Sequence, residues 1–321
     1  MMTKPQTPNL RRNWPLERRL HYRGAILFVV WLTACVHTGN QPTDTPPGTS
    51  TSLSSEAACT IAAQIQDPGD PWPLPQVGWY LSALQIAEIM KGETPPPTDN
   101  ADLAEIVHSP HFAQNDASCN RALQTQNYRD LGAFFSVDEN GGPLLTPEEI
   151  GRVRALMARI RVEQDLVTWP YKDTDPSHYP SVKGFNRNRP FIAYMDPPNN
   201  LRVCKGTKGV RDPDKIGKEE QTKIQSQMGS SFPSAHAAES IAQARALGLI
   251  FAERKDRLLA RAQQIGRDRV ILRVHYPSDV AASFRIGDKI FEALRGSSRF
   301  MQDIEAVRLC PRQPTSSPAS G

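Results

Sequence analysis

Apolar residues recur along this chain with the spacing of helices, and no stretch shows the recurring alternation of a half-buried strand. The clearest helix follows a capping box with proline at the first helical position, Thr146-Pro147-Glu148-Glu149. Its core-facing stripe consists of Ile150, Val153, Met157 and Ile160. Further helices are expected over residues 57–66, 79–91, 235–252, 254–273 and 279–294, with two short ones between 100 and 135. The pattern therefore predicts an all-α protein with a single compact multi-helix domain.

The two ends of the chain differ in composition from its middle. Residues 1–35 place scattered Lys and Arg before an apolar run, Ala25 to Ala34, which has the length of the apolar region of a signal peptide. Residues 36–55 are rich in Thr, Ser, Pro and Gly and are interpreted as a flexible linker. We expect the helical domain to span residues 56–310. Residues 311–321 are of low complexity and are expected to be disordered.

The predicted leader ends in a cysteine. Leu32-Thr33-Ala34-Cys35 resembles a bacterial lipobox, in which the cysteine becomes the lipidated first residue of the mature protein. The alternative is an ordinary cleaved signal in which Cys35 has no role. The lipobox interpretation is favoured, and it predicts an exported protein of the bacterial periplasm that is lipid-anchored to the envelope membrane. No apolar run after residue 35 approaches the roughly 20 residues of a membrane span, so no other membrane contact is expected.

The cysteine count agrees with export. Of the five cysteines, lipidation of Cys35 leaves four for two disulfides in an oxidising compartment. These candidates are Cys59, Cys119, Cys204 and Cys310. Any pairing of the four is possible, and their order along the chain favours Cys59 with Cys119 and Cys204 with Cys310.

The formal net charge of +4 comes from the leader. Lys4 and five arginines precede residue 24, with only Glu17 against them, so the rest of the chain is slightly acidic. Bulk charge therefore gives no indication of a nucleic-acid partner. His108 and His111 lie at helical spacing, but no cysteine or carboxylate completes a ligand set near them, so they are interpreted as surface residues and no metal site is predicted.

One stretch places an imidazole between a guanidinium and a carboxylate. His275 follows Arg269 by six residues and precedes Asp279 by four, and Pro277-Ser278 between them indicates a helix start with Ser278 as its N-cap. A carboxylate bonded to one ring nitrogen would fix the tautomer and leave the other nitrogen free to attack, while the arginine would hold an anion. Taken alone, such a His-Asp pair is more often structural than catalytic.

Two other stretches carry groups that suit an anion. Residues 183–190, from Lys183 through Arg189 to Pro190, present cations ahead of a rigid proline, although a solvated basic loop is the commoner meaning of such a run. Pro233-Ser234-Ala235-His236 precedes a helix, whose first backbone N–H groups would point with the Ser234 hydroxyl at one spot. The alternative is a capped helix with an incidental histidine.

Together the three stretches resemble the signature of the type 2 phosphatidic acid phosphatase superfamily, and most closely its class A non-specific acid phosphatases. That signature reads K-x(6)-R-P, P-S-G-H and S-R-x(5)-H-x(3)-D. It appears here over residues 183–190, Pro233 to His236, and residues 268–279, in the same order. The resemblance covers roughly residues 70–308, weakly before 180, and implies the all-α fold of acid phosphatases and vanadium haloperoxidases.

The resemblance implies a metal-independent acid phosphatase that hydrolyses phosphomonoesters through a phosphohistidine and needs no cofactor. His275 would be the nucleophile held by Asp279, and His236 the general acid and base. The phosphate-binding groups would be Lys183, Arg189, Ser234, Ala235 and Arg269. A homo-oligomer is left open. The rival readings are a vanadium-dependent haloperoxidase and a non-catalytic envelope lipoprotein that keeps the scaffold.

Three positions depart from the signature. Lys183 lies one residue too close to Arg189, with Val182 at the lysine position. Ala235 replaces a glycine, which would be strained if the position required a positive φ. Asp268 replaces a serine, and its carboxylate could repel a phosphate or pair with Arg269.

Overall fold

The computed structural model describes residues 53–69, 74–75, 78–97, 100–127, 130–173, 179, 182–193, 203–207 and 228–310. Within these residues the chain is helical, and its only β pairing is an isolated bridge between Val137 and Pro143. The predicted all-α class is therefore confirmed. The predicted leader with Cys35, nearly all of the predicted linker and the predicted tail lie outside the described residues.

The described helices are α1 (Ser55–Gln64), α2 (Ala83–Met90), α3 (Asn100–His108), α4 (Asp116–Gln124), α5 (Leu131–Phe135), α6 (Pro147–Lys172), α7 (Pro190–Ala193), α9 (Ala235–Ile250), α10 (Lys255–Ile271), α11 (Pro277–Arg295) and α12 (Ser298–Leu309). Short 3₁₀ turns occur at Pro110–Phe112 and Ala252–Arg254. None of these helices is long and apolar enough to cross a membrane.

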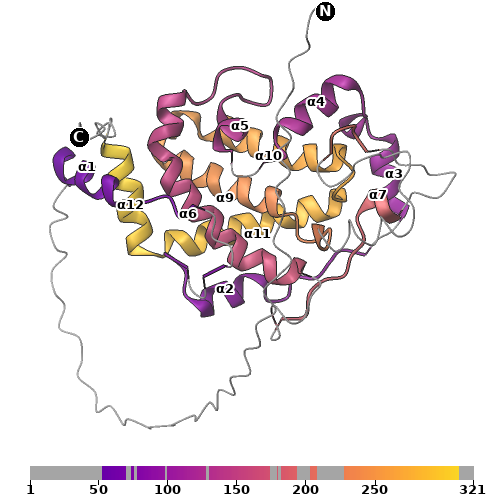
Figure 1. Cartoon of the computed structure of the whole chain (residues 1–321), viewed down its shortest axis with the longest axis horizontal. Coiled ribbons are helices and arrows are strands. Elements are labelled where there is room, and N and C mark those ends of the chain that lie inside the picture. The colour runs from indigo at the N-terminus through magenta and orange to yellow at the C-terminus, as the bar shows by residue number, and fades with distance from the viewer. Residues whose placement is uncertain are drawn as a thin grey trace, which may run out of the picture. The chain divides into compact units, whose positions relative to one another are not determined.

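Helix α9 forms the centre of the bundle. It packs against α10, α11, α6 and α12, which surround it in Figure 1. Small side chains allow these close contacts: α9 contains many alanines, and a Cβ on Gly287 of α11 would lie 2.5 Å from the carbonyl oxygen of Ala238. Most residues of α9 are buried, and at its N-terminal end Ser234 is fully buried while Ala235 and His236 are partly exposed.

Helix α6 extends well beyond the apolar stripe that predicted it. The capping box at Thr146 forms as predicted, with Thr146 accepting from the backbone of Glu149 and the Glu149 side chain accepting in return. The helix continues beyond the predicted stripe, which ends at Ile160, to Lys172, with Pro170 inside its last turn. Proline there removes a single backbone donor, which a helix end tolerates better than its middle. This extension carries Lys172 into the interior of the molecule.

Two other expectations about helices need correction. Helix α11 begins at Pro277 with Tyr276 as its N-cap, so Ser278 lies inside the helix and does not cap it. Pro277 at the first helical position and the Asp279 carboxylate, which accepts from the Tyr276 N–H at 3.1 Å, explain this earlier start. Helix α12, which the sequence patterns did not indicate, packs against α1 and α9.

The four cysteines of the domain form two disulfides, but not in the pairing that their order favoured. Cys59 pairs with Cys310, and Cys119 pairs with Cys204. The first pair forms because α1 packs against α12, which brings the two Cα atoms within 4.8 Å. The second joins α4 to residues 203–207. Tertiary packing, which sequence order does not encode, decides both pairs.

Candidate active site

Four segments meet at the N-terminal end of α9. They are the end of α6, residues 185–189, residues 228–234 that lead into α9, and the turn at residues 272–276 between α10 and α11. Backbone hydrogen bonds tie them together: Ser230 N–H donates to Lys172 O at 3.0 Å and Ser231 N–H donates to Arg187 O at 2.9 Å. Gly229 permits the closest approach, since its φ is +67° and a Cβ there would lie 2.5 Å from the Lys172 carbonyl oxygen.

His275 is buried, with 3% of its surface exposed. Its Nδ1 lies in hydrogen-bond contact with the carbonyl oxygen of Ser231. A carbonyl only accepts, so Nδ1 carries the proton and Nε2 keeps its lone pair when the ring is neutral. Nε2 faces Nη1 of Arg189 at 3.5 Å. The ring is therefore held in the tautomer that a nucleophilic Nε2 requires.

Asp279 lies behind His275, as the sequence predicted, but it does not hydrogen-bond the ring. Its Oδ2 is 4.0 Å from Nδ1 of His275. The carboxylate instead accepts from the Tyr276 N–H and forms an ion pair with Nη1 of Arg187. Burial raises the pKa of Asp279, and Arg187 opposes that shift. The carbonyl of Ser231 therefore fixes the tautomer, and Asp279 lies beside the ring without hydrogen-bonding it.

Two predicted arginines lie in the site. Arg189 is 3% exposed and donates to the carbonyl oxygens of Val274 at 2.8 Å and Met228 at 2.6 Å. Arg269 is 5% exposed, and its Nε and Nη1 have no hydrogen-bond partner within the described part of the chain. Burial lowers the pKa of Arg189 to about 9 and that of Arg269 to about 10. Donors buried without partners cost free energy, which a bound anion would recover.

A third buried cation, Lys172, was not among the residues that the motifs identified. It is 3% exposed, and its Nζ donates to the carbonyl oxygens of Ser230 at 2.8 Å and Pro233 at 2.7 Å. Burial and the neighbouring Arg189 hold its pKa well below the usual range for lysine. A motif search at fixed spacing cannot find this residue, because Lys172 precedes Arg189 by more than twice the signature interval. Its only sequence signal was its place downstream of the capping box at Thr146, in the long helix that starts there.

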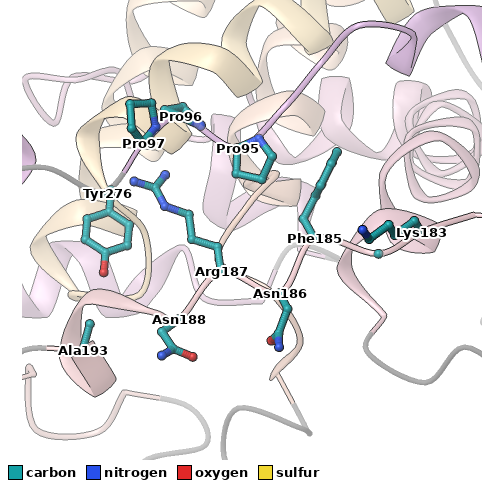
Figure 2. A pocket seen from close by; sticks show the side chains of 11 residues that line it. Pro95, Pro96, Pro97, Lys183, Phe185, Asn186, Arg187, Asn188, Ala193 and Tyr276 are labelled. Atoms are coloured by element: carbon teal, nitrogen blue, oxygen red, sulfur yellow. The ribbon is translucent and has the colours of Figure 1, made fainter.

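Lys183, the lysine that the motif did identify, has an exposed side chain. It lines a pocket of about 710 Å³ together with Arg187, Tyr276 and a rim of prolines at residues 95–97. Figure 2 shows Lys183 and Tyr276 at opposite ends of that pocket. Neither His275 nor Arg189 lines it. The assignment of Lys183 to phosphate binding stays a prediction.

The start of α9 supplies further groups. Ser234 is its N-cap, and the Ser234 Oγ is buried without a hydrogen-bond partner among the described residues. Ala235 is the first helical residue and its φ is not positive, so it carries none of the strain that a glycine-specific position would impose. The hydroxyl and the first N–H groups of α9 point to one end of the helix, where its dipole favours an anion.

His236 lies next to these groups on α9. Its Nε2 is 3.1 Å from the carbonyl oxygen of Gln126 and therefore donates to it, and its ring contacts Phe134. Burial first, and then the charges of Arg269, Lys172 and Arg189, hold the pKa of His236 well below its usual range. The pKa of His275 is lowered for the same reasons. Both imidazoles are thus held neutral by burial among cations.

The carboxylate of Asp268 forms its ion pair with Arg121 and not with Arg269 among the described residues. It is buried, and its Oδ1 accepts from Arg121 Nε of α4 at 3.2 Å and from Gln264 Nε2 at 2.9 Å. The charge of Asp268 nevertheless raises the pKa of Arg269 and so helps to keep that guanidinium protonated. His108 and His111 are exposed, as expected for surface residues. The described residues contain no group of three or more His, Cys, Asp or Glu that could hold a metal ion.

Comparisons with known proteins show what this chain resembles. Residues 181–290, which include the candidate catalytic residues, match the model of the PAP2 superfamily. The chain is also 27% identical, over 235 residues, to a non-specific acid phosphatase of Providencia stuartii, across 72% of this chain and 83% of that protein. The resemblance drawn from the three motifs is thereby confirmed, as is the all-α fold of this superfamily.

Proposed function

We propose that this relative of the PAP2 superfamily is a phosphoric monoester hydrolase, an acid phosphatase that works through a phosphohistidine on Nε2 of His275. One observation carries the proposal. A buried imidazole, with its tautomer fixed by the Ser231 carbonyl, presents its free nitrogen to a group of buried cations and unpartnered donors. A phosphate monoester brings an electrophilic phosphorus and the anionic oxygens that those donors lack.

The bound phosphate would be held by charge and by hydrogen bonds. Arg269 offers Nε and Nη1, Ser234 offers its hydroxyl, and the start of α9 offers the backbone N–H of Ala235. Arg189 and Lys172 add buried positive charge beside them. Positive groups that are fixed before the substrate arrives stabilise the charge of the transition state without reorganisation. They supply charge that a metal ion would otherwise provide, which supports metal independence.

The reaction would proceed in two steps. In the first, Nε2 of His275 attacks phosphorus, the P–O ester bond breaks, and the leaving alkoxide takes a proton from protonated His236. In the second, water attacks the phosphohistidine and gives its proton to His236 as the N–P bond breaks. The products are an alcohol, inorganic phosphate and the regenerated imidazole of His275. The charge of Asp279 would stabilise His275 while its Nε2 carries the phosphoryl group.

The depressed histidine pKa values indicate a working pH on the acid side. His275 must be neutral to attack, and its low pKa keeps it neutral in mildly acidic solution. His236 must be protonated, and a bound phosphate dianion would offset the surrounding cations and raise its pKa again. Both conditions are met together below neutrality, which supports the prediction of an acid phosphatase.

Export is part of the same proposal. The two disulfides are typical of proteins that fold in an oxidising compartment. Lipidation of Cys35 and attachment to the envelope membrane remain predictions from the sequence of the leader.

The test is hydrolysis of a chromogenic aryl phosphate between about pH 5 and 6 with a chelator present, for the protein, for His275→Ala and for the surface control His111→Ala. We expect turnover that survives chelation, a loss of about 10⁴-fold or more in kcat/KM for His275→Ala, and no change for the control. Alkaline quenching during turnover should retain a base-stable phosphohistidine that His275→Ala lacks.

The other outcomes separate the rival readings. Turnover that chelation abolishes would contradict metal independence. Peroxide-driven halide oxidation with added vanadate, without phosphatase turnover, would support the haloperoxidase. Phosphate binding without either activity would leave the non-catalytic scaffold.

A further inference from the structure

Arg187 bridges two carboxylates that come from different helices. Its Nη1 pairs with Oδ1 of Asp279 on α11, and its Nη2 pairs with Oδ2 of Asp102 on α3 at 3.0 Å. All three side chains are buried, at 5% exposure or less for Arg187 and Asp279 and 6% for Asp102. Removing one partner of a buried ion pair strongly destabilises a protein, because the other charge is then left buried and uncompensated. Each of the three residues therefore holds the others in place.

Asp102 and Arg187 also contact other groups around the site. Asp102 accepts from the Ser278 N–H at 3.1 Å and from the Ser278 hydroxyl, which holds α3 against the first turn of α11. The Arg187 guanidinium lies 4.2 Å from the centre of the Tyr276 ring, and its backbone N–H donates to the Ser230 hydroxyl at 3.2 Å. The bridge therefore connects α3, α11 and the segment that supplies the Ser231 carbonyl to His275.

We propose that Asp102 and Arg187 form a positioning pair that fixes the carboxylate of Asp279 behind the nucleophile His275. The inference rests on the proposed function for the role of His275, but the pair itself is defined by contacts. Asp102 lies on α3, outside residues 181–290, which match the superfamily model.

The pair controls how strongly Asp279 attracts a proton to His275. With Arg187 in contact, the charge of Asp279 is largely balanced, and the carboxylate stays 4.0 Å from Nδ1. Without the guanidinium, Asp279 is an uncompensated buried anion next to an imidazole. The His275–Asp279 pair then takes up a proton at higher pH, whichever of the two groups holds it.

Other charged groups face His275 and set the background for this effect. They are Lys172 at the end of α6, Arg189 before α7, His236 on α9 and Arg269 on α10. All of them disfavour a proton on His275, and none contacts Asp102 through an ion pair among the described residues. A substitution at Arg187 or Asp102 therefore changes the balance on the Asp279 side and leaves these cations in place.

The test compares Arg187→Gln, Arg187→Lys and Asp102→Asn in the full chain. For Arg187→Gln we expect the acid limb of the kcat/KM profile to move up by about one pH unit or more and kcat/KM to fall by about 10- to 100-fold. Arg187→Lys keeps the charge but cannot bridge both carboxylates, so the acid limb should stay in place while kcat falls.

Asp102→Asn should behave like Arg187→Lys. In the double variant it should cause no further loss of kcat/KM beyond that of Arg187→Gln. Arg245→Gln, which removes a surface pair with Asp288, is the matched control and should change neither quantity.

A second readout does not depend on turnover. The titration of the His275 ring, followed by NMR of the labelled imidazoles, should shift upward in Arg187→Gln and remain as in the parent protein in Arg187→Lys. If the parent protein lacks phosphatase turnover, the proposed function fails while this titration still tests the pair. A folded Arg187→Gln with an unchanged limb and titration would overturn the proposal, as would fully additive effects of Asp102→Asn and Arg187→Gln.

Discussion

Two groups of buried charged residues lie along α6, and they differ in how the protein compensates for their burial. At the end of α6, Lys172 joins Arg189 and Arg269 around His275. Earlier on α6, Glu163 and Asp165 lie in the core, and Asp165 acts on the buried Glu239 of α9. The first group consists of cations with Asp279 beside them, and the second consists of carboxylates with the buried Arg161 beside them.

The carboxylates of the acidic group can avoid the free-energy cost of a buried charge by taking up protons. Burial raises the pKa of Glu163 to about 7 and that of Glu239 well above the usual range, so both take up protons at mildly acidic pH. Glu163 also accepts from the Tyr80 N–H at 2.8 Å, and Glu239 accepts from Gln243 at 2.9 Å. A carboxylic acid with such neighbours is an ordinary, neutral core residue.

The two arginines of the cationic group have no such route, because guanidinium groups do not give up their protons near neutral pH, whereas burial lowers the pKa of Lys172. Arg269 in addition keeps two buried donors without a partner in the described part of the chain. The difference teaches that burial of charge alone does not identify a site. A buried charge does identify a site when a change of protonation cannot neutralise it and no partner in the protein pairs with it. In this protein such a charge indicates that the site binds an anion.

The largest effect is expected from removing one charge of the cationic group. Lys172→Met keeps the volume of the side chain but removes its charge and the donors to Ser230 and Pro233. We expect kcat/KM for an aryl phosphate to fall by about 10²- to 10³-fold. The acid limb of the profile should move to higher pH, because a cation that lowers the pKa of both His275 and His236 is gone.

Lys289→Met is the control for that variant, since Lys289 pairs with Glu93 at the surface and lies outside the site. If Lys172→Met folds and keeps both the rate and the limb of the parent protein, Lys172 is not part of the functional cation group. Inorganic phosphate binding, measured by calorimetry, should weaken in Lys172→Met and not in Lys289→Met.

The acidic group should show itself in stability and not in catalysis. The folded pKa of Glu163, about 7, lies above its unfolded value of 4.5, so its contribution to stability is fully present below pH 4.5 and is lost as pH rises through 7. At pH 8 this loss lowers the free energy of unfolding by about 3 kcal/mol. Glu163→Gln cannot ionise, so its urea midpoint should fall less between pH 5 and pH 8 than that of the parent protein.

The control for this measurement is Glu88→Gln, a carboxylate that is 65% exposed on α2. It should show the same dependence on pH as the parent protein. If the curves of Glu163→Gln and the parent run parallel from pH 5 to pH 8, the ionisation of Glu163 does not limit stability. The acidic group would then need another form of compensation.

The sequence predicted the helices better than their contacts. Apolar spacing and the capping box at Thr146 were sufficient for the all-α class, because they are local properties of a helix. The disulfide of Cys59 with Cys310 was not predictable, since it depends on α1 packing against a helix that the patterns did not indicate.

The site was predicted in the same uneven way. His275, His236, Arg189, Arg269 and Ser234 were found through motifs whose short loops keep the spacing fixed, and the structure brings them together. Lys172 was missed because its separation from Arg189 along the chain does not follow the motif. Arg187 and Asp102 were missed because both depend on tertiary contacts: Arg187 pairs with Asp279, 92 residues away, and Asp102 pairs with Arg187, 85 residues away.

The smallest expected effect concerns the lysine that the motif did find. Lys183 is exposed beside the surface pocket, so solvent screens its charge from the buried centre (Figure 2). Lys183→Met should therefore lower kcat/KM by less than about tenfold at low salt, and the difference should shrink at about 0.5 M salt. Steady-state kinetics at the two salt concentrations, beside Lys172→Met, measures this directly. A loss at Lys183 that equals the loss at Lys172 and persists in salt would mean that residues 182–189 bring Lys183 onto the phosphate when substrate binds. The buried cation group would then be incomplete without it.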